Sequence, residues 1–356
     1  MTARGAAAIM LAVVGRDSRV DTRLKGMLMP LPATMTAITI TRPGGPEVLQ
    51  PVTRPVPQPG DRQVLIEVAY AGINRHDCGQ RTRGTPPPGA TDIPGLEVAG
   101  LVAAIGAQVT RWKVGDQVCA LVNGGGYAEF CLAEEPVTLP LPAGFDLKRA
   151  AALPESLLTA WLNVFMLGRL RRGEWLLVHG GSSGVGTIAI QLGVLEGAQV
   201  IATAGNEAKV HACRTLGATG INYRERDFVA EVLRATADHG ADVVLDMAGT
   251  AYAKRNLDAL AMDGRIVHLS GAGGDYSVPL NAIMAKRAVI TGSLLRGSAL
   301  SLKTEIVRQV TERVWPHLGT RVKPLIDSVF PLLRAADAHA RMESSAHVGK
   351  ILLEVR

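Results

Sequence analysis

An apolar strand that runs into a glycine-rich turn and then into a helix is the feature that most limits how this chain can fold. The strand covers residues 175–178, the turn carries Gly181, Gly184 and Gly186, and a helical apolar pattern continues to Leu195. Backbone N–H groups converge at such a turn and glycine leaves room for a ligand, which is typical of a diphosphate site. A second strand at 199–204 completes a βαβ unit, as in dinucleotide-binding folds. A tight turn without a ligand is the alternative.

The turn departs from the usual glycine pattern at one position. Ser183 stands where the second glycine usually lies, and we expect it to crowd a ligand slightly while offering a hydroxyl donor. The turn as a whole provides these candidate cofactor-binding residues: Gly181, Ser182, Ser183, Gly184, Val185 and Gly186.

The end of the second strand indicates which dinucleotide binds. An acidic residue there would accept hydrogen bonds from a ribose 2′-hydroxyl and repel a 2′-phosphate, but no acid follows Ala204. Lys209 lies four residues beyond Gly205, near the start of the next helix, where a cation favours a phosphate. The pattern therefore predicts NADP(H) rather than NAD(H). Glu207 could offset this charge, and a solvated surface lysine is the alternative reading of Lys209.

Strand and helix patterns alternate after the turn, as a doubly wound sheet requires. They predict about six parallel strands between residues 157 and 296. Beyond the βαβ unit, strands are expected at 221–223, 242–246, 265–269 and 289–293, and helices at 228–235, 252–261 and 280–286.

The flanking segments have a different character. Residues 35–150 combine short apolar strands with many Gly and Pro residues, which indicates a barrel-like β-rich unit. After residue 297 we expect one or two helices and then a strand at 348–355 that has no parallel neighbour left and returns to the first domain. The predicted fold class is therefore α/β, with a discontinuous β-rich domain (35–156 and 297–356), an inserted doubly wound domain (157–296), and a substrate cleft between them.

Composition argues against nucleic-acid and membrane partners. The net charge is +6, but half of it comes from residues 1–34, and no dense Lys/Arg stripe follows. No uninterrupted apolar run approaches the ~20 residues needed to cross a bilayer. Residues 1–34 are interpreted as a disordered leader or the product of an upstream start. The four cysteines lack Cys-x-x-Cys spacing, which indicates free thiols in a reducing, cytoplasmic compartment.

Several further motifs occur in a fixed order along the chain: AGINRHD (71–77), GLEVAGLV (95–102), VGDQV (114–118), GGYAE (125–129), LTA (158–160), the glycine turn and GKI (349–351). With them the chain resembles the zinc-independent quinone oxidoreductases of the medium-chain dehydrogenase/reductase superfamily over residues 35–356. Details near residues 86–89 and 293–296 are most similar to the tumour-suppressor-inducible branch.

The resemblance implies a GroES-like catalytic domain, an inserted Rossmann domain and chemistry without zinc. Zinc alcohol dehydrogenases of the superfamily place Cys where this chain has Asn74 and His where it has Leu96, and neither replacement suits zinc. The cysteine-rich zinc lobe is also missing between Val118 and Tyr127. A quinone is already electrophilic and accepts hydride without a Lewis acid, so no metal site is predicted.

The resemblance also assigns roles to residues. It places Gly205, Lys209 and Tyr223 at the 2′-phosphate and adenine end, and Asn74 and Thr159 at the nicotinamide end. Five further residues line the nicotinamide ring, and one belongs to the last motif. The five are Ser270, Gly271, Ser293, Leu294 and Leu295, and the residue of the last motif is Lys350.

The candidate catalytic residues are Asn74, Asp77 and Thr159. Asp77 is a possible proton donor or a buried structural acid, and Tyr127 is a donor or a packing aromatic. His76 and His179 are interpreted as structural or solvated, and water can supply the proton to a quinone.

We therefore expect NADPH-dependent reduction of a quinone or enone by a homodimer that forms by extension of the edge strand near 289–294. An NADPH-dependent enoyl-thioester reductase and a non-catalytic NADPH-binding redox sensor or RNA-binding module are the alternatives. Gly79 and Thr85 stand where relatives place larger groups. This predicts a roomier substrate pocket that accepts bulky quinones or enones.

Overall fold

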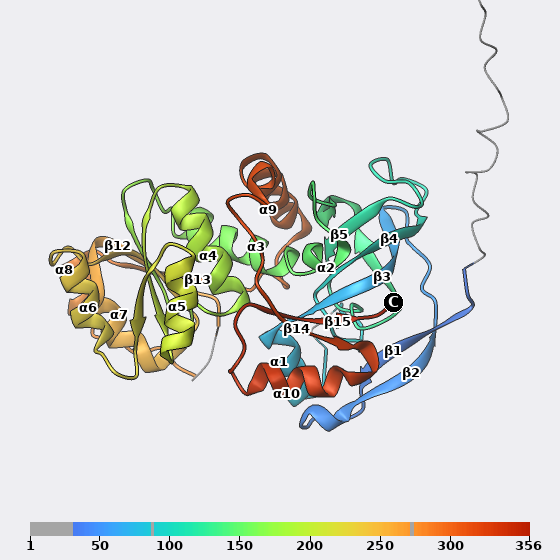
Figure 1. The fold of residues 1–356 in the computed structure, drawn as a ribbon, viewed down its shortest axis with the longest axis horizontal. Helices are drawn as coiled ribbons and strands as arrows, with labels where there is room; N and C mark the ends of the chain where they lie inside the picture. The colour runs from blue at the N-terminus through green and yellow to red at the C-terminus, as the bar shows by residue number, and fades with distance from the viewer. Residues whose placement is uncertain (1–30, 87–88, 271–273) are drawn as a thin grey trace, which may run out of the picture. The chain divides into compact units, whose positions relative to one another are not determined.

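In the computed structural model, which describes residues 31–86, 89–270 and 274–356, the glycine-rich turn follows the third strand of a six-stranded parallel sheet (Figure 1). The strands lie in the order β10-β9-β8-β11-β12-β13, and every neighbouring pair is parallel. This is the 3-2-1-4-5-6 order of dinucleotide-binding folds, so the expected doubly wound sheet is confirmed. The strands are β8 (Trp175–Val178), β9 (Gln199–Ala204), β10 (Thr219–Asn222), β11 (Ala241–Asp246), β12 (Leu260–His268) and β13 (Val289–Gly292).

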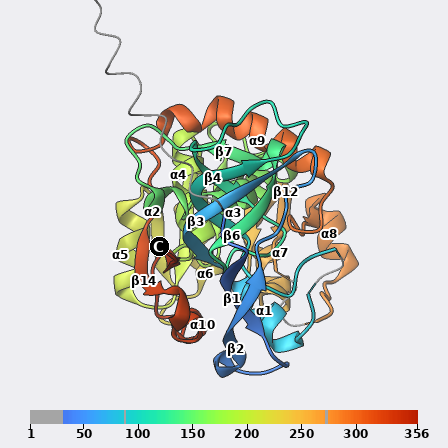
Figure 2. The ribbon, with the colours of Figure 1, turned by 90° about the vertical axis from the view of Figure 1, so that its right-hand side faces the viewer.

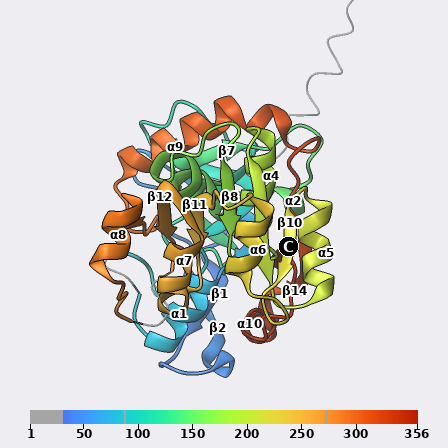
Figure 3. The ribbon, with the colours of Figure 1, turned by 90° about the vertical axis from the view of Figure 1, so that its left-hand side faces the viewer.

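Helices cover both faces of this sheet. Leu176 and Val178 pack in one core cluster with Ile188 of α4, whereas Leu177 packs in another with Phe228 of α6, because successive strand residues point to opposite faces. The first cluster lies under α4 and α5, and the second under α6, α7 and α8 (Figures 1 and 3). The helices are α4 (Gly184–Leu195), α5 (Glu207–Thr215), α6 (Phe228–Ala235), α7 (Ala253–Ala259) and α8 (Leu280–Lys286).

The start of β12 was predicted wrongly. The expected helix at 252–261 ends at Ala259, and β12 begins at Leu260 rather than at residue 265. Leu260 pairs with Ala241 before the register shifts, so the strand starts with an irregular segment. Buried Leu260 and Ala261 suit a helix and a strand equally, which is why periodicity could not place this boundary.

The second sheet joins strands from residues 63–140 to the last two strands of the chain. Its order is β14-β15-β3-β4-β5-β7, and β6 pairs with the first half of β3 on the edge where β15 pairs with the second half. A separate antiparallel pair joins β1 and β2. The strands are β1 (Thr34–Ile40), β2 (Leu49–Pro55), β3 (Gln63–Ile73), β4 (Glu97–Ile105), β5 (Gln117–Leu121), β6 (Phe130–Glu134), β7 (Thr138–Pro140), β14 (Ile326–Pro331) and β15 (Lys350–Glu354).

The last strand returns to the first domain, as expected, because β15 pairs antiparallel with β3. The expectation that it has no parallel neighbour is wrong, since β14 lies parallel to it. Most residues of β14 are only half buried, and polar Asp327 and Ser328 interrupt its apolar pattern. The predicted fold class, a discontinuous β-rich GroES-like domain with an inserted Rossmann domain, is confirmed.

The remaining helices connect the two sheets. Helix α3 continues as a π-helix through Leu162–Leu167 and so crosses the predicted boundary at residues 156–157. The domain limits therefore stay a prediction. Helices α1 and α10 both pack against the 3₁₀ turn Pro46–Val48 between β1 and β2 (Figure 2). The helices are α1 (Arg75–Arg83), α2 (Leu147–Ala150), α3 (Pro154–Trp161), α9 (Leu300–Arg313) and α10 (Ala335–Glu343), with 3₁₀ turns at Glu135–Val137, Gly249–Tyr252, Trp315–His317 and Leu332–Arg334.

One stretch of the described residues, Leu147–Leu167, is long and apolar enough to cross a membrane, but most of it is buried inside the fold as α2 and α3. All four cysteines are free and buried. The cytoplasmic location stays a prediction, and the predicted leader at 1–34 lies almost entirely outside the described residues.

Replacement of Leu352 by alanine tests the contribution of the returning strand. Leu352 is fully buried in β15 between β14 and β3, so we expect Leu352→Ala to lower the free energy of unfolding by about 2–5 kcal/mol. Urea denaturation measures the change. The matched control is Leu333→Ala, whose side chain is 66% exposed and whose loss we expect to cost less than about 0.5 kcal/mol. Equal losses in the two variants would contradict the role of β15.

Candidate functional site

A cavity of about 890 Å³ lies along the glycine turn and the ends of β9 and β15. It brings together most of the predicted site residues from distant parts of the chain. The predicted residues that line it are Asn74, Ser182, Ser183, Gly184, Val185, Gly205, Lys209, Tyr223, Ser270, Leu294 and Lys350. The predicted residues that do not line it are Asp77, Thr159, Gly181, Gly186, Ser293 and Leu295, and Gly271 lies outside the described residues.

Two glycines of the turn are required by packing. A Cβ on Gly186 would lie 2.3 Å from the carbonyl oxygen of Gly180, and one on Gly181 would lie 2.7 Å from the Cβ of Ala202. No side chain fits in either position, so these glycines let α4 approach β8 and β9 closely. They shape the turn from behind while Ser182, Ser183, Gly184 and Val185 face the cavity.

The hydroxyl of Ser183 has a different role from the one expected. Ser183 is the N-cap of α4, and its Oγ accepts a hydrogen bond of 3.0 Å from the backbone N–H of Gly186. The hydroxyl itself donates to the Sδ of Met247 at 3.4 Å. It is therefore engaged within the protein, and the residues that carry the first N–H groups of α4, Gly184 and Val185, line the cavity.

The C-terminal GKI motif is joined to the glycine turn. The N–H of Gly349 donates to the carbonyl of Ser182 at 2.8 Å, and Ser183 and Gly349 form an isolated parallel bridge. Gly349 has a φ of +83°, and a Cβ there would lie 2.3 Å from the carbonyl oxygen of Leu325. This turn delivers Lys350 to the wall of the cavity.

Lys350, Glu97 and Asn74 form a buried polar cluster at one end of the cavity. The Lys350 ammonium donates to Glu97, to the Oδ1 of Asn74 at 2.6 Å and to the carbonyl of Ile73 at 3.3 Å. The Asn74 amide nitrogen donates to Glu97 at 3.0 Å. All three donors of the ammonium are engaged, so Lys350 fixes the orientation of the Asn74 side chain.

Thr159 stands behind this cluster. Its hydroxyl donates to Glu155 at 3.0 Å, and the N–H of Glu155 donates to Glu97 at 2.9 Å. Burial and the nearby Glu97 carboxylate raise the pKa of Glu155 to about 7. Asn163 links the carbonyl of Thr159 to the hydroxyl of Ser293 through hydrogen bonds of 2.8 and 2.9 Å. Thr159 thus connects α3 with the end of β13.

Asp77 lies behind Asn74 and is fully buried. Its Oδ2 accepts from the N–H of Asn74 at 2.8 Å and from the hydroxyl of Tyr127 at 3.0 Å. Burial raises the pKa of the Asp77 carboxyl to about 6. These contacts hold the start of α1, where Asn74 sits, and they favour the structural reading of both Asp77 and Tyr127.

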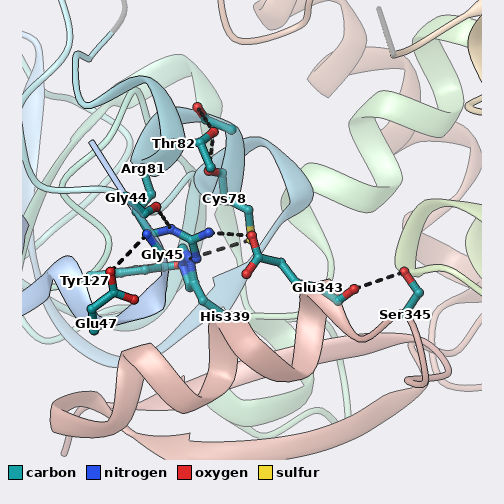
Figure 4. Close-up of polar contacts among 11 residues, drawn as sticks. Gly44, Gly45, Glu47, Cys78, Arg81, Thr82, Tyr127, His339, Glu343 and Ser345 are labelled. Carbon is teal, nitrogen blue, oxygen red and sulfur yellow. Dashed lines mark hydrogen bonds and ion pairs between the residues drawn. The ribbon is translucent and has the colours of Figure 1, made fainter. Parts of the chain in front are cut away.

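The hydrogen bonds beyond Tyr127 have a fixed direction (Figure 4). Arg81 only donates, so the Nδ1 of His339 accepts a hydrogen bond from it at 3.2 Å. The proton of the neutral ring is therefore on Nε2, which donates to the hydroxyl oxygen of Tyr127 at 3.0 Å. Burial and Arg81 lower the pKa of His339 to about 3, so the imidazole is neutral. Arg81 also pairs with Glu343 and thereby ties α1 to α10.

The other end of the cavity is crowded with cations. Lys209 donates to the carbonyl of Ser345, and its pKa is lowered by burial and by nearby arginines that include Arg224 and Arg75. Both arginines line the cavity beside Tyr223. Neither arginine was predicted from the sequence, although Arg224 directly follows Tyr223 and Arg75 directly follows Asn74, which were both predicted site residues.

Glu207 does not offset this charge. Its carboxylate pairs with Arg214 at 2.7 Å on the exposed side of α5. The expectation that Glu207 could offset the charge of Lys209 is therefore wrong, because Glu207 is paired elsewhere. The periodicity of the sequence could not predict this ion pair.

His179, the second histidine considered as a proton donor, has a structural role. His179 is 1% exposed; its Nδ1 lies 3.0 Å from the hydroxyl of Thr203, and its Nε2 lies 2.8 Å from the Oδ1 of Asn256. Burial lowers its pKa. His76, in contrast, lines the cavity.

Comparison with known proteins agrees with this architecture. Residues 60–143 match the family described as the alcohol dehydrogenase GroES-like domain, and residues 184–313 match the zinc-binding dehydrogenase family. A quinone oxidoreductase of Rattus norvegicus is 34% identical over 90% of this chain and 97% of its own length. The chain belongs to the medium-chain dehydrogenase/reductase superfamily. Its placement in the tumour-suppressor-inducible branch stays a prediction.

Solved structures of the superfamily share the fold. A quinone oxidoreductase of Pseudomonas syringae has a TM-score of 0.80 and 28% identity, over 90% of this chain and all of that one. A mycobacterial member solved in complex with NADPH has a TM-score of 0.81 and 29% identity, again over 90% of this chain and all of that one.

Replacement of Asp77 by asparagine tests the buried carboxyl through the pH dependence of stability. The ordinary pKa of 3.8 is raised to about 6, so between about pH 4 and pH 6 the folded state keeps a proton that the unfolded state has lost, and stability falls as the pH rises. Asparagine can accept the same two hydrogen bonds without this charge. We expect the stability of Asp77→Asn relative to the parent to increase by about 2–3 kcal/mol over this range and then to level off.

Urea denaturation at intervals from pH 4 to pH 8 measures this difference. Every other titrating group is common to both proteins, so the difference isolates Asp77. A difference that does not change with pH would contradict a raised pKa at this site.

Proposed function

We propose that this chain binds NADPH in the described cavity and transfers its hydride to a quinone or a related conjugated carbonyl. The observation that carries the proposal is the pairing of two unlike ends in one cavity. A glycine turn and a cation cluster form one end, and the Asn74–Lys350–Glu97 cluster forms the other. Relatives named quinone oxidoreductases, and the member solved with NADPH, support the same reading.

The residues of the first end fit the phosphates of NADPH. The N–H groups at the start of α4, a helix of twelve residues, lie where Ser182 and Ser183 line the cavity, and they suit a diphosphate. Lys209, Arg224 and Arg75 suit the additional 2′-phosphate, which distinguishes NADPH from NADH. No carboxylate stands directly at the end of β9 to repel it, and Glu207, three residues beyond, is paired with Arg214.

The second end fits the nicotinamide and the acceptor. NADPH supplies a hydride there when it is bound. The Asn74 amide is held in one orientation by Lys350 and Glu97, and Ser270 and Leu294 provide a polar and an apolar wall. Catalysis then depends on positioning two reactants in a fixed cavity, for which no acid or base at the cavity wall is required.

Zinc does not fit this site. The Asn74 side chain is already hydrogen-bonded to Glu97 and Lys350. The Lys350 ammonium beside it would repel a metal cation, and Leu96 has no atom that could act as a metal ligand. Within residues 31–86, 89–270 and 274–356, no group of three or more His, Cys, Asp or Glu side chains is arranged to hold a metal ion. The proposed reaction therefore uses an acceptor that is already electrophilic.

An acceptor screen tests the reaction itself. We expect NADPH oxidation with ortho- and para-quinones at ordinary enzyme rates, about 1–10³ s⁻¹, measured by loss of absorbance at the nicotinamide band. Turnover of enoyl thioesters with none of quinones would instead identify an enoyl-thioester reductase. Tight NADPH binding without turnover of any acceptor would identify a binding module.

The cation cluster predicts cofactor preference. We expect Lys209→Ala and Arg224→Ala each to weaken NADPH binding by about 10-fold or more, because each removes a charge-assisted hydrogen bond, while NADH binding stays unchanged. Titration of cofactor fluorescence measures both constants. The matched control is Lys113→Ala, an exposed lysine outside the cavity, which we expect to bind both cofactors as the parent does. Equal weakening of NADH and NADPH would contradict a 2′-phosphate role.

We also propose that the protein forms a homodimer through β13. This strand is at the edge of the parallel sheet in the described chain, and its Val289 is 41% exposed. An uncovered edge strand can pair with a second copy of itself. Light scattering coupled to gel filtration is expected to give twice the mass of one chain, and a monomer mass would contradict this assembly.

A further inference from the structure

Helix α1 presents two different faces. His76, Gly79 and Arg83 follow one another at helical spacing and all line the cavity. Asp77 and Arg81 belong to the opposite face, where each is at most 1% exposed and bound in the polar network described above. The cavity face of α1, defined here as His76, Gly79 and Arg83, is therefore free to contact a ligand while the other face holds the helix in place.

Glycine at position 79 leaves space that the end of the Arg83 side chain occupies. The Nη1 of Arg83 is 3.2 Å from the place that a Cβ on Gly79 would occupy, and a longer side chain there would push the guanidinium away. The space predicted to enlarge the substrate pocket is thus taken by a cation. Within the described part of the chain, Arg83 makes no ion pair and no side-chain hydrogen bond.

A second guanidinium lies behind this face. Arg296 is only 8% exposed, and its donors go to the amide oxygen of Gln80 at 2.7 Å and to the side chain and carbonyl of Asn123 at 3.2 and 3.1 Å. None of these acceptors carries a charge. Burial lowers the pKa of Arg296 and the nearby carboxyls of Asp77 and Glu155 oppose that shift, so its charge is partly balanced from behind the helix.

His76 lies near both guanidinium groups. Its Nε2 is buried and has no hydrogen-bond partner among the described residues. Burial, Arg296 and Arg83 lower the pKa of His76 to about 4, so the ring is neutral near pH 7. Arg83 lines the cavity and has no partner among the described residues, so an anion in the cavity can pair with its guanidinium.

We propose that the cavity face of α1 is a subsite for an anionic substituent of the acceptor, so that quinones or conjugated carbonyls carrying a carboxylate or a similar anion are preferred over neutral ones. The inference rests on the proposed function and names its substrate class. The Arg83 fork binds such a group through two parallel N–H donors, and the neutral ring of His76 lines the cavity beside it. Gly79 keeps Arg83 in reach.

Equilibrium binding tests the subsite without requiring turnover. Protein saturated with NADP⁺ is titrated calorimetrically with 2-naphthalenesulfonate and with 2-naphthol, which share the ring system and differ in charge. We expect the sulfonate to bind about tenfold more tightly, and Arg83→Gln and Gly79→Met to remove this preference, while Arg83→Lys keeps part of it. Arg308→Gln is the matched control because Arg308 is an exposed arginine of α9 outside the cavity, and its variant is expected to keep the full preference.

Turnover provides the second measurement. The ratio of kcat/KM for 1,2-naphthoquinone-4-sulfonate over 1,2-naphthoquinone is expected to fall about tenfold in Arg83→Gln, with the value for the neutral quinone changed much less. A parent protein that binds 2-naphthol as tightly as the sulfonate, or an Arg83→Gln variant that keeps the preference, would overturn the proposal. Normal turnover of the neutral quinone would then leave the proposed function standing. A sulfonate preference without any quinone turnover would support the subsite and contradict the proposed function.

Discussion

The buried ion pair between Lys350 and Glu97 is the interaction on which the site depends. Two charges withdrawn from water are tolerated only when they are paired and their remaining hydrogen bonds are satisfied. Here the ammonium uses all its donors on Glu97, Asn74 and Ile73, and the other Glu97 oxygen accepts from the N–H of Glu155. The pair thereby joins β15, β4, the start of α1 and the start of α3 at a single point beside the glycine turn.

Few groups at the site can act as acids toward a ligand. Burial raises the pKa of the Glu155 carboxyl to about 7 and that of the Asp77 carboxyl to about 6. The Glu97 carboxylate adds to the rise at Glu155, whereas Arg296 and Lys350 oppose the rise at Asp77. Both carboxyls are enclosed behind Asn74, and neither lines the cavity. The chemistry that suits such a site is one in which geometry is supplied by the protein and the proton comes from water.

Local sequence patterns predicted the fold well where each element buries a regular apolar face. Helices α6 and α8 begin and end at the expected residues, and the alternation of strands and helices predicted the six-stranded parallel sheet that the structure shows. Patterns failed where burial is partial or ambiguous, as in β14 and at Leu260. At the site, the glycine turn and Lys209 were found from local chemistry. The roles of Glu155, Arg224 and Arg296 depend on contacts between distant segments, which no local pattern encodes.

The two faces of α1 separate structural requirements from selectivity along one short helix. Asp77 and Arg81 are tied into a network that reaches α10, so their replacement would disturb several elements at once. On the other face, His76 and Arg83 have no side-chain hydrogen bonds to the described residues, and Gly79 has no side chain. Changes on that side can therefore accumulate with small effects on the fold, so this wall of the cavity is able to vary while the architecture stays the same.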